Sequence, residues 1–147
     1  MIKSVEHFSF TVSNMEAALY FFQDLLGLHA SAIMQVENRV VRQIVGMPDA
    51  VLRIAIVEAP GGNKIELIEY IRPEGTKVDS KPCNPGIAHI AFVVEDIEKA
   101  CQELNQKGIN FVNPPVWAPG NEGSGRWGVC YLKGPDDITI ELIEKQS

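Results

Sequence analysis

Two histidines and two glutamates recur in matching sequence surroundings. His7 stands in the segment Val-Glu-His-Phe, and His89 stands in the similar segment Ile-Ala-His-Ile. Glu66 and Glu141 are each the second residue of an identical segment, Ile-Glu-Leu-Ile-Glu. The chain therefore has the pattern of one module written twice, in which each copy supplies one imidazole near its start and one carboxylate near its end.

These four side chains are a suitable ligand set for one divalent metal ion. Neutral imidazole and carboxylate oxygen together favour borderline divalent ions. A six-coordinate ion would keep two positions for water or for two neighbouring oxygens of a substrate. A carbonyl compound chelated in this way becomes a stronger carbon acid, because the metal stabilises the enediolate. Glu141 or Glu66 could then shuttle the proton between adjacent carbons.

Each of these residue types also has a structural alternative. A lone histidine is more often a hydrogen-bonded core residue than a ligand, but the equivalence of His7 and His89 in the repeat favours ligands. Glu66 and Glu141 could be exposed charges on strands. Their apolar neighbours indicate a core strand instead, where a carboxylate needs a cavity or a partner.

The elements that must position these residues follow the order strand, helix and three strands, twice over. In the first copy, residues 5–12 alternate as a strand with the polar side chains on one face. Ser13 is the expected N-cap of a helix that runs to about Leu26, with Glu16 reaching back in a capping box. An extended segment is expected over 28–46. Two further strands are predicted, at 51–57 and 64–71.

The second copy repeats this plan after a linker at 73–86, which is rich in Pro and Gly. The expected elements are a strand at 87–94, a helix at 96–107, a short strand at 109–112, an irregular or edge segment at 114–119 and strands at 128–132 and 138–144. The glycine-rich segment 120–125 has the composition of a mobile loop.

The predicted fold class is therefore α+β, in one domain over residues 1–147. Modules at 1–72 and 87–147 each contribute a mixed half-sheet. Neither half can bury both faces of its sheet alone, so we expect the two to form a cup-shaped open barrel with the helices outside. The inward face would then carry all four candidate ligands.

Three further side chains are candidates for substrate binding. Arg53 is placed on the predicted cup face, where it could hold a carboxylate or phosphate, with an ion pair between strands as the alternative. Arg126 follows the glycine-rich segment, and Gln43 lies in the segment predicted to be extended and cup-facing.

Other conspicuous residues are given structural roles. Glu69 and Glu144, the last residues of the repeated segment, are expected at solvated positions. Trp117 and Trp127 flank the segment predicted to be a loop, where packing is favoured over a role in a lid.

Composition limits the class of protein further. The formal net charge of −6 argues against nucleic acid as a partner. Three cysteines without a CxxC pair indicate a reducing, cytoplasmic environment rather than a disulfide framework. No apolar run reaches the length of a membrane span, and we expect no signal peptide.

The chain resembles the vicinal oxygen chelate superfamily, which includes glyoxalase I, methylmalonyl-CoA epimerase, extradiol dioxygenases and the bleomycin and fosfomycin resistance proteins. The resemblance rests on the four His and Glu segments and covers nearly the whole chain. It implies paired βαβββ modules, one metal ion (Ni, Co, Zn, Mn or Fe) and a homodimer, with modules paired within a chain or swapped between chains. The order His, Glu, His, Glu is that of bacterial-type glyoxalase I.

The resemblance implies a metal-dependent lyase or isomerase of the glyoxalase type that acts on a small carbonyl substrate. In glyoxalase I an Arg and an Asn hold glutathione, whereas the matching positions here carry Thr11 and Tyr70, so the use of glutathione is not carried over. The alternatives are an acyl-CoA or 2-oxo-acid epimerase, a ring-cleaving dioxygenase and a ligand-binding or resistance protein without catalysis. A fourth protein ligand disfavours the dioxygenase, because it occupies a position that oxygen would need.

Overall fold

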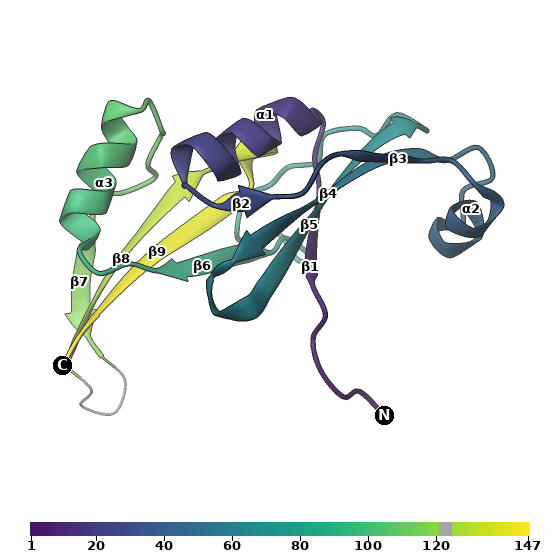
Figure 1. Cartoon of the computed structure of the whole chain (residues 1–147). Helices are drawn as coiled ribbons and strands as arrows, with labels where there is room; N and C mark the ends of the chain where they lie inside the picture. The colour runs from purple at the N-terminus through teal and green to yellow at the C-terminus, as the bar shows by residue number, and fades with distance from the viewer. Residues whose placement is uncertain (121–124) are drawn as a thin grey trace. The chain divides into compact units, whose positions relative to one another are not determined.

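The computed structural model describes residues 1–120 and 125–147. The chain forms two compact units, Met1–Lys77 and Val78–Ser147, and each carries its own sheet (Figure 1). The segment 120–125, predicted from its composition to be a mobile loop, lies mostly outside the described residues.

The first unit is built on a five-stranded sheet. Its elements are β1 (Phe8–Thr11), α1 (Met15–Leu19), a π-helical turn (Tyr20–Leu25), β2 (His29–Ala30), β3 (Met34–Val36), α2 (Arg39–Val45), β4 (Val51–Ala59), a 3-10 turn (Pro60–Gly62) and β5 (Asn63–Arg72). The strand order is β1-β5-β4-β2, and β3 also pairs with β4. β1 runs parallel to β5, whereas β4 is antiparallel to it.

Alternation along the two long strands separates the faces of this sheet. Ile65 and Leu67 on β5 are fully buried, as are Ala55 and Val57 on β4. The intervening residues, Glu66 among them, are only half-buried. This period of two is the one that the sequence predicts for a half-buried strand. The buried face of the sheet forms the core and packs against α1.

Helix α1 begins one residue later than the sequence predicts. The N-cap is Asn14, not Ser13, and its side-chain oxygen accepts a hydrogen bond from the backbone N–H of Ala17 at 2.8 Å. With Asn14 as the N-cap, the third helical position is Ala17 rather than Glu16, and the carboxylate of Glu16 pairs with Arg53. Both Ser and Asn are good N-caps, so composition does not distinguish them.

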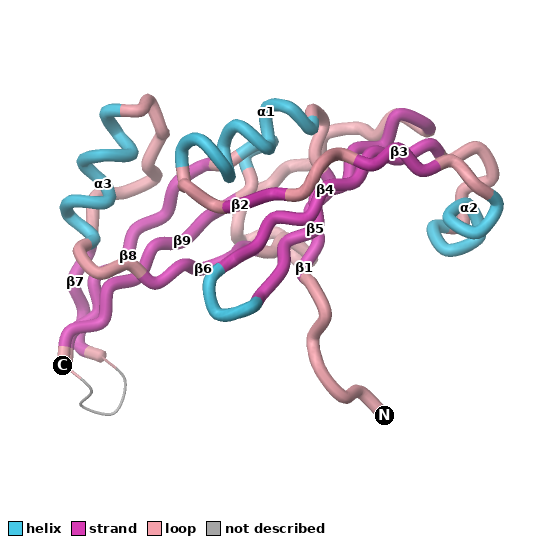
Figure 2. Tube along the Cα trace, viewed as in Figure 1, coloured by secondary structure: helices cyan, strands magenta, loops and turns pink. Residues whose placement is uncertain are grey.

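The prediction of an extended segment over 28–46 is wrong for its second half. Residues 39–45 form helix α2, seen in cyan in Figure 2. The side chain of Asn38 caps it by accepting from the backbone N–H of Val41 at 3.0 Å, and Gly46 ends it in the left-handed region at φ 69°. These caps prevail over the strand preference of the β-branched residues between them.

The second unit is built on a four-stranded sheet. Its elements are β6 (His89–Val93), α3 (Ile97–Gln106), β7 (Val116–Pro119), β8 (Arg126–Lys133), a 3-10 turn (Pro135–Asp137) and β9 (Thr139–Gln146). The strand order is β6-β9-β8-β7, so β7 is the edge strand that the sequence allows. Again the first strand is parallel to the last, and the other pairs are antiparallel.

Helix α3 follows the prediction closely. Asp96 caps it by accepting from the backbone N–H of Lys99 at 2.9 Å, and Gly108 follows at φ 84°. The prediction of a short strand at 109–112 is wrong, because only one isolated β-bridge forms there, between Phe111 and Leu132. The side chain of Asn113 accepts from the backbone N–H of Tyr131 and so interrupts the ladder.

The two units therefore share one plan, and the α+β class with two mixed sheets is confirmed. The first unit departs from it by the inserted helix α2 and by dividing one expected strand into β2 and β3. Within the part of the chain that is described, no helix is long and apolar enough to cross a lipid bilayer.

Candidate metal half-sites

The first His–Glu pair lies where β1 meets β5. Ser9 is the partner of Glu66 across the parallel pair, and His7 precedes Ser9 by two residues on the same face. Nε2 of His7 lies 3.3 Å from Oε2 of Glu66, and both side chains are partly exposed. The pairing of two strands that are far apart in sequence thus brings the imidazole to the carboxylate.

A second carboxylate orients the imidazole of His7. Nδ1 lies 2.5 Å from Oε2 of Glu6, and Nζ of Lys64 donates to Oε1 of the same carboxylate at 2.6 Å. The hydrogen bond with Lys64, followed by the one with His7 and then by the charge of Lys64, lowers the pKa of Glu6 below its ordinary value. The carboxylate of Glu6 favours the tautomer with the proton on Nδ1, in which His7 presents the lone pair of Nε2 to Glu66.

In that tautomer, Nε2 of His7 and Oε2 of Glu66, which lie 3.3 Å apart, are both acceptors. Two lone pairs repel each other unless a proton or a cation lies between them. A carboxylate–histidine pair in which the far nitrogen is free for a metal is a common metal-binding arrangement.

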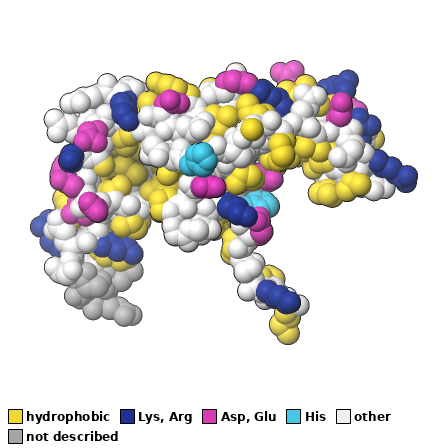
Figure 3. Space-filling view, in the orientation of Figure 1, with side chains coloured by type: hydrophobic (Ala, Val, Ile, Leu, Met, Phe, Trp, Pro, Cys, Tyr) yellow, Lys and Arg dark blue, Asp and Glu magenta, His cyan; other side chains and the backbone are white. Residues whose placement is uncertain are grey.

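The second pair repeats this geometry in the other unit. His89 is the first residue of β6, and Ala91, two residues on, is the partner of Glu141 on β9. Nε2 of His89 lies 3.1 Å from Oε2 of Glu141. Tyr131 is the partner of Glu141 on β8, and its ring centroid lies 5.7 Å from that of His89. On the first unit, in the region of β1 and β2, Figure 3 shows histidine side chains (cyan) beside acidic side chains (magenta).

Both spacings fit adjacent ligands of one ion. Two donors that are each about 2.1 Å from a metal and at right angles to each other lie about 3 Å apart. Each unit taken alone offers one imidazole and one carboxylate, which is too few for a metal centre. Across the described residues, no group of three or more His, Cys, Asp or Glu side chains is gathered as a metal site. We therefore call each pair a half-site.

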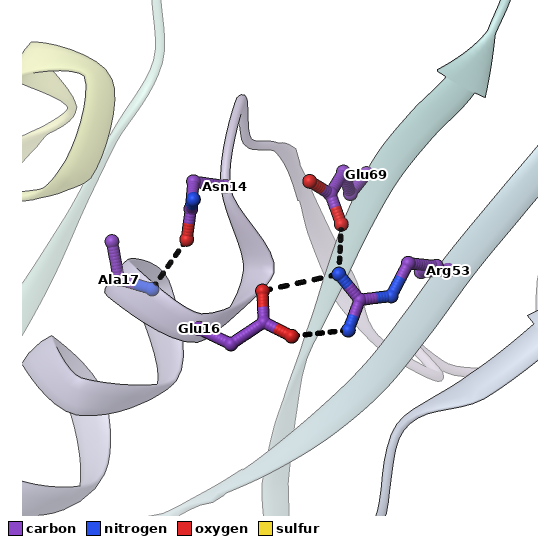
Figure 4. Close-up of polar contacts among 5 residues, drawn as sticks. All are labelled: Asn14, Glu16, Ala17, Arg53 and Glu69. Carbon is purple, nitrogen blue, oxygen red and sulfur yellow. Dashed lines mark hydrogen bonds and ion pairs between the residues drawn. The ribbon is translucent and has the colours of Figure 1, made fainter.

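Arg53 does not lie on the face predicted for it. Ile56 is the partner of Glu66, so Arg53, three residues away, is on the opposite face of the sheet. There its guanidinium contacts the carboxylates of Glu16 on α1 and Glu69 on β5, the latter at 2.7 Å (Figure 4). The structure therefore shows the alternative role of Arg53, an ion pair, rather than a place on the cup face.

The cause lies in the alternation of β4 itself. Arg53 shares its face with Ala55 and Val57, which are fully buried in the core. The hydrogen bonds to Glu16 and Glu69 raise its pKa, and Arg53 in turn lowers that of Glu16.

The prediction of solvated positions for Glu69 and Glu144 is wrong. Each is only 9% exposed. Glu69 forms an ion pair with Arg53. Glu144 accepts a hydrogen bond at 2.8 Å from the backbone N–H of Ile97, at the start of α3. Glu144 therefore attaches β9 directly to α3, where its carboxylate meets the positive end of the helix dipole. Glu69 is connected to α1 through Arg53, which also pairs with Glu16.

Arg126 and Gln43 are not beside the half-sites of their own units. Arg126 is on the face of β8 opposite Tyr131, and its guanidinium lies 5.2 Å from the ring centroid of Trp117. Gln43 is exposed on α2 rather than on a strand, because the segment around it is helical.

The two tryptophans make packing contacts, as the sequence favours. The indole N–H of Trp117 donates to Glu98 on α3 at 3.3 Å. Nζ of Lys145 lies 4.8 Å from the ring of Trp127.

Sequence reasoning missed Glu6, Lys64 and Tyr131. The adjacency of Glu6 and His7 is a signal that could have found the first. Tyr131 also lines a pocket of about 370 Å³ in the second unit, together with Lys81 and Lys133. Its position opposite Glu141 depends on the register of two strands, which the sequence does not supply.

Comparison with known proteins gives the family of the chain. Residues 4–142 match the family model for the Glyoxalase/Bleomycin resistance protein/Dioxygenase superfamily. The chain belongs to this superfamily, as its resemblance to the vicinal oxygen chelate proteins implies.

Individual relatives are distant. A probable lactoylglutathione lyase from Synechocystis is 26% identical over 96% of this chain and 95% of its own length. A 2-epi-5-epi-valiolone epimerase from Actinomyces is 25% identical over 95% of this chain and 78% of its own. The crystal structure of a glyoxalase family protein from Bacillus cereus matches with a TM-score of 0.81 and 24% identity, over 100% of this chain and 97% of that one.

Proposed function

We propose that this protein is a metal-dependent lyase or isomerase of the glyoxalase type. Its ligands would be His7, Glu66, His89 and Glu141, with the two half-sites meeting on one divalent ion. The observation that carries the proposal is the repeated pair, with Nε2–Oε2 distances of 3.3 and 3.1 Å in the two units. Relatives named as a lyase and as an epimerase support an enzymatic role.

A divalent ion held by these residues would supply Lewis acidity to two oxygens of a small carbonyl substrate. The protein would supply the base. Glu141 or Glu66 removes the proton next to the carbonyl and returns it to the adjacent carbon. The ring of Tyr131 and the pocket beside it lie in the unit of Glu141, and we assign them to the remainder of the substrate.

Metal analysis tests the proposal directly. The purified chain, stripped of metal and reconstituted separately with Ni, Co, Zn, Mn and Fe(II), should retain about one ion per chain after desalting. Glu66→Gln and Glu141→Gln should each lose this binding, whereas Glu58→Gln, an exposed carboxylate on neighbouring β4, should retain it. A folded chain that retains none of the five ions would refute the proposal.

The substrate can be approached by comparing two assays. The positions that the resemblance connects with glutathione are Thr11 and Tyr70, both on the face of the sheet that carries Glu66. We therefore expect turnover of 2-oxo-aldehydes or 2-oxo acids without glutathione. Turnover only of the glutathione hemithioacetal would instead place the protein with the relative named as a lactoylglutathione lyase.

An epimerase is the second candidate, and the relative of that name favours it. Its signature is the exchange of solvent deuterium into the substrate carbon next to the carbonyl, with no net conversion to a new compound. Ligand binding that is insensitive to chelators and to Glu141→Gln would indicate a binding protein without catalysis.

The half-sites can meet within one chain or between two chains of a homodimer. Light scattering of the metal-loaded chain gives the oligomeric state. Mixing inactive His7→Ala and inactive His89→Ala proteins then distinguishes the two arrangements. Activity returns only if half-sites are shared between chains.

A further inference from the structure

Two cysteines from different elements of the second unit lie side by side. Sγ of Cys101, in the middle of α3, is 3.2 Å from Sγ of Cys130 on β8. Cys130 is fully buried, whereas Cys101 is partly accessible. The third cysteine, Cys83, is exposed.

The packing of α3 on the sheet brings these thiols together. Cys130 is on the face of β8 that carries Leu132, and its partner on β9 is Leu142. Leu104 of α3 is buried in the same unit. The helix and the strand are thus held by a hydrophobic core, and the two thiols face each other within it.

We infer that Cys101 and Cys130 are an oxidation site, at which a peroxide converts the two thiols to an intramolecular disulfide. A disulfide needs its sulfur atoms about 2.05 Å apart, so a small rotation of the two side chains suffices.

The chemistry balances with a peroxide as the two-electron oxidant. Cys101, the accessible thiol, attacks the peroxide oxygen and becomes a sulfenic acid, and the O–O bond breaks to release water or an alcohol. The sulfur of Cys130 then displaces the hydroxyl group of the sulfenic acid, which leaves as water. Two thiol hydrogens are lost, and one S–S bond forms.

The surroundings make this reaction slow rather than immediate. Burial raises the pKa of Cys101, and burial followed by the contact with Cys101 raises that of Cys130 to about 12. Thiolates are the reactive form, so both thiols resist oxidation until peroxide exposure is sustained. In a reducing compartment the pair stays reduced.

The bond would join α3 to β8 on the face away from His89 and Glu141. It would close the chain between residues 101 and 130, which reduces the freedom of the unfolded state. We expect the midpoint of thermal unfolding to rise by about 10 °C. The geometry of the half-site should be unaffected, because the bond lies across the sheet from it.

The test uses the full chain with Cys83→Ser, which removes the exposed thiol. After sustained incubation with hydrogen peroxide, intact mass should fall by two hydrogen atoms, and peptide mapping without reductant should recover a cross-linked peptide that contains Cys101 and Cys130. Dithiothreitol should restore the mass, both free thiols and the original unfolding temperature.

Further variants provide the matched controls. In the same background, Cys101→Ser and Cys130→Ser should show no loss of two hydrogens and no increase in unfolding temperature. Addition of oxygen to Cys101 without loss of two hydrogens would overturn the inference, as would a disulfide between chains. The mass and peptide readouts need only Cys83→Ser, so the test stands even if a core serine variant does not fold.

Discussion

The indole of Trp117 lies directly over Gly128. A Cβ built on residue 128 would lie 2.9 Å from the nearest ring carbon, a distance that real Cβ atoms essentially never show. Gly128 is the partner of Glu144, just as Arg53 is the partner of Glu69 in the other unit. The two modules therefore fill equivalent places by different means, an arginine in one and a tryptophan over a glycine in the other.

Gly128→Ala should lower the free energy of unfolding by about 1–3 kcal/mol, because the added methyl group overpacks the space beneath the indole. Chemical denaturation followed by tryptophan fluorescence measures this. Gly75→Ala is the matched control, since no atom lies within 4 Å of its added Cβ. The double variant with Trp117→Leu should be less destabilised than the sum of the single variants, and strict additivity would contradict the contact.

Arg53→Met should destabilise the chain by about 2–3 kcal/mol, because it leaves the carboxylate of Glu69 buried without its cation. The Arg53 side chain is 23% exposed, which moderates the loss. Urea denaturation gives the value, and Arg39→Met, exposed on α2, should change it little. If Arg53 instead held substrate, the variant would raise KM at unchanged stability.

Glu6→Gln should weaken metal binding by about 10–100-fold, because the amide is a poorer partner for Nδ1 of His7 than the carboxylate is. Competition with a metallochromic chelator measures the dissociation constant. Glu37→Gln, an exposed change in the same unit, should leave it unchanged. Equal affinity of the Glu6→Gln and unmodified proteins would show that His7 is not oriented in this way.

The pKa of Glu6 should lie below the ordinary value of 4.5, with Lys64 as the principal cause. Because the folded-state pKa is depressed, the stabilisation from this contact is fully present above 4.5 and is lost as the pH falls through the lower folded-state value. Carboxyl NMR titration checks this. Lys64→Met should raise the pKa toward its ordinary value, whereas an unchanged titration would contradict the ion pair.

The sequence predicted four ligands on one inward face, and the structure brings them together as one His–Glu pair in each unit. Once His7 and His89 open their strands and Glu66 and Glu141 occupy the last strands, a shared module plan requires the same pairing in each copy. The structure shows this register, with the residue two after each histidine opposite the glutamate. Alternation of polar and apolar residues also gave the correct face for Glu66.

The substrate candidates were harder to predict, because an isolated arginine carries no periodic signal. Alternation already put Arg53 beside Ala55 and Val57, which is the core face, and its assignment to the cup overlooked a buried carboxylate as partner. Gln43 was assigned to a strand because its β-branched neighbours favour one. The caps at Asn38 and Gly46 make the segment helical instead. The buried roles of Glu69 and Glu144 depend on helices that are distant in sequence, which no local pattern reveals.

The parallel pairing of the first and last strand in each unit has a consequence for how such proteins diverge. Each half-site is complete within one module, so a substitution that removes an imidazole or a carboxylate from one copy leaves the donors of the other in place. After a gene duplication, the two copies can therefore drift separately, and ligand loss in one half is a single heritable step toward a different chemistry.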